Sequence, residues 1–489
     1  MKVLQIKGIL LIALLLCTLI SVEGAATYYV DAAKPDDTGD GTSWVTAKHT
    51  IQGAIDITVA GDTVMVTNGV YNEGGAVSTY GATAYALTNR VHYPHKLTIQ
   101  AVSTNPADTV IVGAPDPDTG GLGPKAIRCV QIGHIFLPNY LIGFTLTNGY
   151  TLASADTGNT YYDKSGGGFK GAIDNRVTVS NCVIVDCHSG EYGGGGHALT
   201  LKDSVVKNCT AKLGGGLASM ETVDDCIISG NSSSAGGGGV SGGIFNDCIL
   251  SNNTANSTGG GAGAGVSEFF DCVITDNVST GVNANAGAIT ISCNATRCII
   301  RNNYAVQYGG VTYGTATTKG TYVNCLITGN RAGKAGGISF GKVKFVNCTM
   351  VGNTCDQSTS ATYAGVGGCR QSFNTTTTSM MATNCIIYGN TDADGENNYM
   401  SAVSIANTLT YPDPTGETYD DGGNITGDPK FVGSGSYQLT ANSPAVNAGL
   451  TLSYVTTDII FVPRPVGKND MGCYESGFTT SDGTVIIIQ

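Results

Sequence analysis

The sequence is poor in charged residues, in aromatic residues and in helix-forming patterns. Only 13% of its 489 residues are Asp, Glu, Lys or Arg, 7% are aromatic, and there is a single Trp. In the central region, no window of about 12 residues places its apolar side chains on one helical face. Short β-branched runs separated by Gly, Asn and Ser occur there instead. These absences exclude a helical protein and favour one that is built from short strands.

Basic residues are scarcer than acidic ones. The 25 Lys and Arg against 37 Asp and Glu give a formal net charge of −12. This balance argues against nucleic acid or an anionic membrane surface as a partner. The C-terminal run Val485–Ile488 is too short to cross a membrane, and no membrane span is expected.

The N-terminus carries the features of an export signal. Lys2 and Lys7 precede an apolar run from Gly8 to Ile20, and small residues follow at 24–26. The apolar run is too short to span a membrane. Residues 1–26 are therefore predicted to be a secretory signal peptide, and the mature chain is predicted to be secreted or held at the cell surface.

The most abundant feature is one repeated phrase, seen most clearly in residues 225–231 followed by the glycines 236–239. Its anchor position recurs about every 22 residues, which is the length of one coil of a solenoid. The anchor column is Cys182, Ser204, Cys226, Cys248, Cys272, Cys298, Cys325, Cys348 and Cys385. An aliphatic residue stands two positions after each anchor, and from the third coil an Asn stands five positions after it. The Asn column is Asn231, Asn253, Asn277, Asn303, Asn330, Asn353 and Asn390.

The spacing of these columns predicts the fold. Side chains alternate along a strand, so the anchor and the aliphatic residue two positions later face the core together. The Asn amides are expected to bond to the neighbouring coil, and the Gly runs are expected to turn the corners. We predict an all-β protein, a right-handed parallel β-helix of about twelve coils of about 22 residues. A helical cap at the N-terminus and a small capping domain at the C-terminus are expected to cover the solenoid.

Two segments support a family resemblance. Residues 28–73, with Trp44 and the amphipathic stretch 50–56, resemble the N-terminal cap of secreted bacterial β-helix proteins of the pectin-lyase-like superfamily. The Pro-Arg-Pro at 463–465 and the segment 470–475 resemble a choice-of-anchor Q-type domain. The predicted domains are therefore the cap and first coils at 27–96, the β-helix at 97–395 and the choice-of-anchor-like domain at 396–489.

The resemblance implies two classes of function. The superfamily includes polysaccharide lyases, which use a Lys or Arg base beside Asp-bound calcium, and glycoside hydrolases, which use clustered Asp residues. No such constellation can be identified in this sequence, and the catalytic residues are unknown. We favour a non-catalytic glycan- or surface-binding or structural protein whose partner is a polysaccharide or a cell-surface component. A polysaccharide lyase or glycoside hydrolase is the alternative.

Candidate binding residues lie in an insertion at 150–165, because insertions on one face of a solenoid often hold its site. Tyr161, Tyr162, Asp163 and Lys164 are the predicted substrate-binding residues. His188 and His197 lack companion metal ligands and are interpreted as surface residues. A second insertion lies at 354–383.

An acidic ladder is the candidate metal site. The residue before the anchor is acidic in four consecutive coils, at Asp203, Asp225, Asp247 and Asp271. These carboxylates are expected at an exposed corner, where they either bond to backbone amides with help from Lys202 and Lys207 or bind a divalent cation such as calcium. No cofactor is required by the fold. The aliphatic residues after each anchor are expected to form an outward stripe, and most cysteines are expected to be free thiols.

Overall fold

The computed structural model describes residues 25–80, 83–132, 138–171, 177–263, 265–290, 293–313, 320–340, 343–357, 366–370, 380–399, 403–411, 413, 420–433, 435–465 and 468–477. The predicted signal peptide, apart from its last two residues, and most of the insertion at 354–383 lie outside these ranges.

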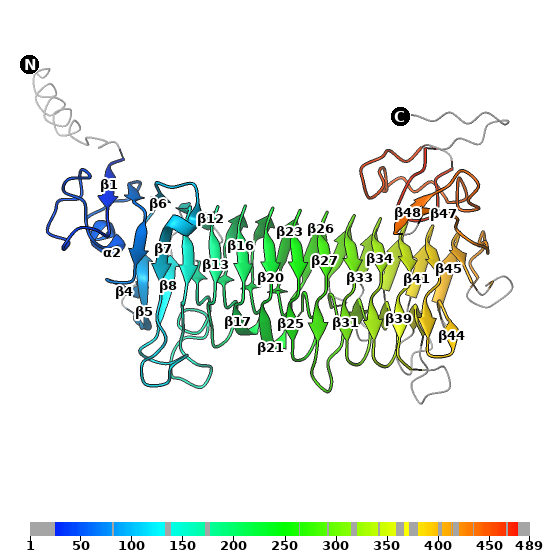
Figure 1. Ribbon diagram of the computed structural model, residues 1–489, viewed down its shortest axis with the longest axis horizontal. Coiled ribbons are helices and arrows are strands. Elements are labelled where there is room, and N and C mark those ends of the chain that lie inside the picture. Colours follow the sequence, from blue (N-terminus) through cyan, green and yellow to red (C-terminus); the bar gives the residue numbers. More distant parts are fainter. Residues whose placement is uncertain are drawn as a thin grey trace, which may run out of the picture.

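The protein is a right-handed parallel β-helix, and its coils stack into a long rod (Figure 1). Each coil contributes one strand to each of several long sheets, and neighbouring coils pair in parallel. The fourteen-stranded sheet contains β1 (Thr27–Val30), β2 (Thr63–Val66), β6 (Thr98–Ala101), β9 (Asn139–Ile142), β12 (Val177–Ser180), β15 (Thr200–Lys202), β19 (Thr222–Asp224), β23 (Gly243–Asn246), β26 (Ser267–Phe270), β29 (Asn294–Thr296), β33 (Gly320–Val323), β37 (Val343–Val346), β41 (Met380–Thr383) and β45 (Val403–Ala406).

The thirteen-stranded sheet follows it around the coil. It contains β3 (Gly69–Tyr71), β7 (Thr109–Val112), β10 (Thr145–Thr147), β13 (Val183–Val185), β16 (Val205–Lys207), β20 (Ile227–Ser229), β24 (Ile249–Ser251), β27 (Val273–Thr275), β30 (Ile299–Arg301), β34 (Leu326–Thr328), β38 (Thr349–Val351), β42 (Ile386–Tyr388) and β46 (Leu409–Thr410). The nine-stranded sheet contains β17 (Thr210–Leu213), β21 (Ser232–Gly236), β25 (Thr254–Ala255), β28 (Val278–Ser279), β31 (Tyr304–Ala305), β35 (Arg331–Ala332), β39 (Thr354–Cys355), β43 (Thr391–Asp392) and β44 (Gly395–Glu396).

Smaller sheets close the coils. The seven-stranded sheet contains β4 (Ala76–Tyr80), β5 (Thr83–Tyr93), β8 (Ile127–Ile132), β11 (Phe169–Lys170), β14 (Gly196–His197), β18 (Leu217–Ala218) and β22 (Val240–Ser241). A three-stranded sheet contains β32 (Thr312–Tyr313), β36 (Ser339–Phe340) and β40 (Cys369–Arg370), and a hairpin contains β47 (Phe431–Gly433) and β48 (Ser436–Leu439). Among the described residues, only α2 (Ile51–Ile55) and the 3₁₀ turn η1 (Pro106–Asp108) are helical.

The predicted inward columns form the core. Cys226 and Ile228 are 1% and 0% exposed, and the other anchors and aliphatic partners are buried in the same continuous cluster. All 15 cysteines from Cys129 to Cys473 are buried free thiols in the structure, and Cys187 and Cys209 are among them. A small polar residue fits the anchor position at Ser204 because its hydroxyl donates to the Lys202 carbonyl at 2.6 Å.

The Asn column is confirmed as a hydrogen-bonded ladder. The Nδ2 of Asn231 donates to the Oδ1 of Asn253 at 3.0 Å, and the Nδ2 of Asn253 donates to the Oδ1 of Asn277 at 2.9 Å. The same bond continues through Asn303, Asn330, Asn353, Asn390 and Asn398. These amides are fully buried, so the ladder satisfies polar groups that would otherwise be costly inside the core.

Glycine is required where the coil turns between the nine-stranded and seven-stranded sheets. Gly237 has a φ of 66°, which side-chain-bearing residues rarely adopt. A Cβ on the next residue, Gly238, would lie 2.3 Å from the carbonyl oxygen of Gly260 in the following coil. Neighbouring coils can therefore stack at this corner only where the residue has no side chain.

The two ends of the rod differ. At the N-terminal end, α2 packs Ile51, Ala54 and Ile55 into the core, and Thr50 caps the helix by accepting a bond from the Gly53 amide at 3.0 Å. At the other end the β-helix runs beyond the predicted boundary at residue 395, because β45 and β46 pair in parallel with β41 and β42.

The C-terminal segment lies on the side of the rod, near its C-terminal end (Figure 1). Residues 431–474 pack on the outer face of the last coils, where Leu439, Ala445 and Met471 contact Ile386 and Leu409. The segment therefore covers a lateral face of the solenoid. No helix among the described residues is long and apolar enough to cross a membrane.

Candidate functional site

The insertion at 150–165 is fixed to the seven-stranded sheet by one buried arginine. The guanidinium of Arg128 donates to the carbonyl oxygens of Gly166 (2.8 Å), Tyr162 (2.5 Å) and Ser165 (3.0 Å). Its remaining donors bond to the amide oxygens of Asn89 (2.6 Å) and Gln131 (2.9 Å). Burial lowers the pKa of Arg128 to about 9. All five donors bond to neutral oxygens, so this arginine holds the loop and has no donor left for a ligand.

The four predicted substrate-binding residues lie in different environments. Tyr161 is 53% exposed and stacks on Tyr192 with ring centroids 5.9 Å apart. Tyr162 is half-buried. Asp163 and Lys164 are buried, where Asp163 accepts a bond from the Asn159 amide and Lys164 donates to the Ser154 carbonyl at 2.9 Å. The two tyrosines can meet a ligand, whereas the two charged side chains stabilise the loop. A substrate-binding role for the four residues stays a prediction.

Two basic groups beneath the loop were not expected from the sequence. Lys170 and His197 are partners in the register of β11 and β14 and are 0% and 3% exposed. Burial lowers the pKa of Lys170 to about 7 and that of His197 well below its usual value. The Tyr162 ring lies 5.4 Å from the Lys170 ammonium. The interpretation of His197 as a surface residue is wrong, because the insertion at 150–165 covers the face of β11 and β14 that carries it. The repeat pattern of the sequence does not indicate this cover. His188 is half-buried and bonds to Thr210 at 2.7 Å.

A polar groove of about 400 Å³ lies where the same loop meets the nine-stranded sheet. Three consecutive coils and two connecting loops contribute its lining residues. The lining residues are Leu122, Ser154, Ser189, Gly190, Thr210, Ala211, Lys212, Ser232, Ser233 and Ser234. The ammonium of Lys212 is ion-paired with Glu191 at 3.0 Å. Six of the ten lining residues carry hydroxyl groups, and those of Ser154, Ser189 and Thr210 are bonded within the protein.

The floor of the groove continues along the rod as an outward-facing column of the nine-stranded sheet. Its members are half-buried or exposed, and they alternate with buried residues such as Ala211, Ser233 and Ala255. By strand register the column is Thr210, Ser232, Thr254, Val278, Tyr304 and Arg331, and we call it the polar track. The Arg331 guanidinium lies 5.3 Å from the Tyr304 ring centroid. The track thus joins hydroxyl groups to an aromatic ring and a cation at roughly 4.8 Å per coil.

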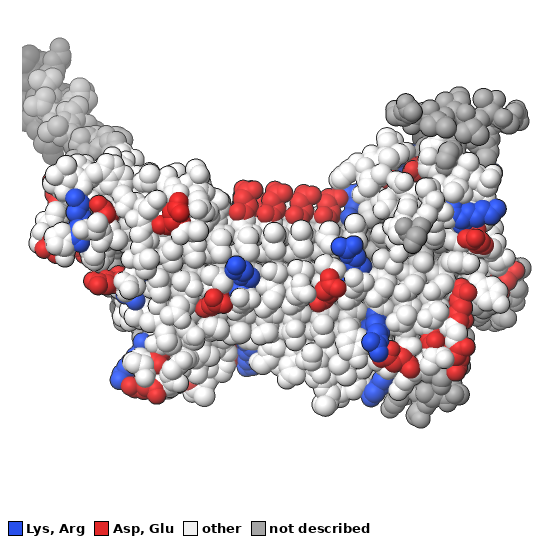
Figure 2. Space-filling view, in the orientation of Figure 1, with Lys and Arg blue, Asp and Glu red and all other residues white. Residues whose placement is uncertain are grey.

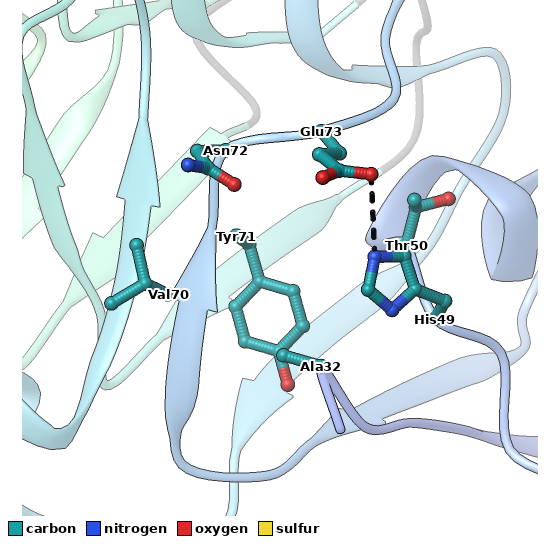
Figure 3. A pocket seen from close by; sticks show the side chains of 7 residues that line it. All are labelled: Ala32, His49, Thr50, Val70, Tyr71, Asn72 and Glu73. Atoms are coloured by element: carbon teal, nitrogen blue, oxygen red, sulfur yellow. Dashed lines mark ion pairs between the residues drawn. The ribbon is translucent and has the colours of Figure 1, made fainter. Parts of the chain in front are cut away.

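A smaller cavity of about 220 Å³ lies beside the N-terminal cap (Figure 3). The Nε2 of His49 faces the Glu73 carboxylate at 3.5 Å, and Tyr71 lies between this pair and Val70. His49 and Thr50 come from the turn before α2. Tyr71 is the last residue of β3, and Asn72 and Glu73 come directly after it. The sequence pattern gave no sign of this pair, because its members belong to the irregular first coils.

The acidic ladder occupies the exposed corner predicted for it (Figure 2). Asp203, Asp225, Asp247 and Asp271 have φ between 47° and 58°, a left-handed conformation that Asp and Asn tolerate. Asp271 receives two bonds of 2.7 Å from Arg297. Burial, followed by the charges of Asp271 and Asp225, raises the pKa of Asp247.

Neither backbone amides nor lysines neutralise the rest of the ladder. The side chains of Asp203, Asp225 and Asp247 accept no hydrogen bond from any described residue, and Lys202 pairs with Asp224 instead, at 3.2 Å. The expected amide bonding is therefore wrong, and the conformational tolerance of Asp explains the column. Within the described ranges, no three His, Cys, Asp or Glu side chains are grouped to hold a metal ion. Calcium on the ladder stays a prediction.

No protein-family model matches the chain, and no curated protein sequence matches it. Solved structures align with most of the chain. A pectate lyase is 13% identical, with 93% of this chain and 97% of that chain covered and a TM-score of 0.40. A rhamnogalacturonan lyase is 16% identical, with 84% and 91% covered and a TM-score of 0.34. A polysaccharide lyase of Pseudopedobacter saltans is 11% identical, with 86% and 96% covered and a TM-score of 0.37.

Proposed function

We propose that the protein is a secreted β-helix that binds glycan chains along the polar track without cleaving them. The observation that carries the proposal is the groove of about 400 Å³ that opens onto this track. Two further parts of the proposal rest on the sequence: export through residues 1–26 on the charge and apolar pattern, and a choice-of-anchor Q-type identity for residues 396–489 on resemblance.

The chemistry of the groove suits a sugar. Serine and threonine hydroxyls both donate and accept hydrogen bonds, as sugar hydroxyls do. Tyr304 offers an aromatic ring along the track, and the Arg331 guanidinium that lies over this ring is ion-paired with Asp356 at 2.6 Å. A linear polymer can lie along a parallel β-helix because equivalent side chains repeat at each coil.

The ionisable groups of the groove do not suit hydrolysis or elimination. Acid–base catalysis needs a group positioned to transfer a proton near neutral pH. Lys212 is the one ionisable residue among the groove lining, and its ammonium is held by Glu191. We therefore expect binding without turnover at this surface.

A glycan array of neutral and acidic polysaccharides, followed by calorimetry, tests the proposal. Tyr304→Ala should weaken binding about ten-fold because it removes the ring of the track. Tyr140→Ala is the matched control, because Tyr140 is an exposed tyrosine on the fourteen-stranded sheet. Loss of binding in the control but not in Tyr304→Ala, or failure of every glycan to bind, would contradict the proposal.

A further inference from the structure

The outer face of the thirteen-stranded sheet is half covered and half open. One aliphatic column runs along it by strand register, through Val205, Ile227, Ile249, Val273, Ile299 and Leu326. Ile459, Cys473, Tyr437 and Tyr474 of the C-terminal segment pack on Ile299 and Leu326, and Leu326 is 6% exposed. Ile227 and Ile249 are 42% and 40% exposed. The same surface is thus an interface at its C-terminal end and is exposed to solvent at its N-terminal end.

The corner column beside this face changes chemistry at the same boundary. Beneath the C-terminal segment the left-handed corner residues include Asn324 and Asn384. Asn324 donates to the Thr457 carbonyl at 2.7 Å and accepts a bond from Arg464 at 3.2 Å. Asn384 donates to the carbonyl of Leu450 at 2.7 Å and accepts from its amide at 2.8 Å. Asn324 and Asn384 are therefore docking contacts where the face is covered, whereas the corner residues are the carboxylates of the ladder where it is open.

A groove of about 370 Å³ joins the two halves. Val273 and Ile299 line it on the β-helix side, and Ile460 and Phe461 line it on the side of the C-terminal segment. Ile460 and Phe461 are 52% and 59% exposed, and Phe461 has a φ of 65°, which an aromatic residue rarely adopts. An apolar turn in a strained conformation therefore faces the open, acid-edged surface. Figure 2 shows the acidic row in the hollow between the N-terminal coils and the C-terminal segment.

We propose that the open face, from Val205 to Val273 with its acidic edge, docks an extended polypeptide segment of another protein in which aliphatic and basic side chains alternate. The aliphatic side chains would cover Ile227 and Ile249, as the C-terminal segment covers Leu326. The basic side chains leave the extended backbone on its opposite side, and their long alkyl chains let the charged groups reach the ladder beside the column. A second copy of this chain does not fit, because its net charge is −12 and the face itself is acidic. A calcium ion alone would leave the aliphatic column exposed.

Peptide binding followed by fluorescence anisotropy tests the proposal. The probe is an alternating Lys–Leu peptide of about ten residues, long enough to cross the four open coils. Alternating Glu–Leu and Lys–Ser peptides test the need for charge and for apolar contact. The Lys–Leu peptide should bind, and its affinity should fall when salt rises from about 50 to about 300 mM. The other two peptides should bind at least about ten-fold more weakly.

Two paired variants locate the binding. Asp225→Asn with Asp247→Asn should weaken binding of the Lys–Leu peptide about five-fold or more. The double variant should keep the left-handed corner conformation, because Asn324 adopts it in this chain. Ile227→Thr with Ile249→Thr should weaken binding of the Lys–Leu peptide about ten-fold. Glu221→Gln, at an exposed acid that directly precedes β19 of the fourteen-stranded sheet, should leave the binding of the Lys–Leu peptide unchanged. Absence of Lys–Leu binding, equal binding of the Glu–Leu peptide, or unchanged binding in both paired variants would overturn the proposal. Light scattering that shows a dimer lost in Ile227→Thr with Ile249→Thr would overturn it too, by assigning the face to self-association.

Discussion

Replacement of one rung of the Asn ladder gives the sharpest prediction about stability. Asn277 is buried, and its side chain takes part in four hydrogen bonds. Its Oδ1 accepts from the backbone amide of Asn253 at 3.0 Å and from the Nδ2 of Asn253 at 2.9 Å. Its Nδ2 donates to the Leu250 carbonyl and to the Oδ1 of Asn303, each at 2.9 Å. Asn277→Ala removes all four bonds at once.

The size of the effect follows from what is left behind. Asn303 Oδ1 still accepts from the backbone amide of residue 277, so it keeps a partner. Both donors of Asn253 lose the acceptor that Asn277 supplies, in a place that water does not reach. Each buried donor left unsatisfied costs about 1 to 3 kcal/mol, so the variant should lose about 3 to 5 kcal/mol of unfolding free energy. Asn256→Ala, at an exposed position two residues beyond Thr254, should change it by less than about 0.5 kcal/mol.

Unfolding in guanidinium chloride, followed by circular dichroism, measures the difference. Because a solenoid can unfold in parts, amide hydrogen exchange of β24 and β27 should accompany it. Exchange should accelerate most in these two strands in Asn277→Ala. A loss below about 1 kcal/mol, with exchange in β24 and β27 unchanged, would refute the reasoning, since buried donors would then have found other partners.

Three further outcomes are expected. Thiol titration in denaturant without reductant should find most of the 15 buried cysteines free, and fewer than about four free groups would contradict the buried-thiol reading. Neighbouring ladder carboxylates about 4.8 Å apart repel by roughly 0.9 kcal/mol in water before salt screening, so millimolar calcium should raise the melting temperature, and Asp225→Asn with Asp247→Asn should abolish the rise. Equal melting temperatures in calcium and in chelator would contradict this. Burial lowers the pKa of Lys170 from about 10.5 to about 7, so the folded protein loses stability as pH falls through that window and levels off below it. Lys170→Met should therefore stabilise the protein at pH 7 and lose that advantage toward pH 10, whereas Lys207→Met, at an exposed position, should change little at either pH.

The repeat itself could be predicted because each column follows from the alternation of side chains along a strand. Cys226 and Ile228 face the core, Ile227 faces outward, and Asn231 bonds to the next coil, as the spacing indicated. These positions depend on contacts between neighbouring coils, and neighbouring coils repeat the same pattern in the sequence.

What could not be predicted depends on contacts between parts of the chain that do not repeat. His197 is buried because the insertion at 150–165 folds over it, and Arg128, which fixes that loop, comes from an irregular coil. The lateral position of the C-terminal segment depends on Asn324 and Arg464, which are 140 residues apart. The polar groove likewise joins Leu122, Ser154 and Ser232, and no local spacing connects these three residues.

The central claim is that glycans lie along the polar track. Amide hydrogen exchange with and without a glycan that binds on the array tests it most directly. Protection is predicted in β17, β21, β25, β28 and β31, beginning at the groove and extending toward Tyr304. Protection confined to residues 150–165 and the seven-stranded sheet, or absent from all five strands while the glycan is bound, would contradict the account.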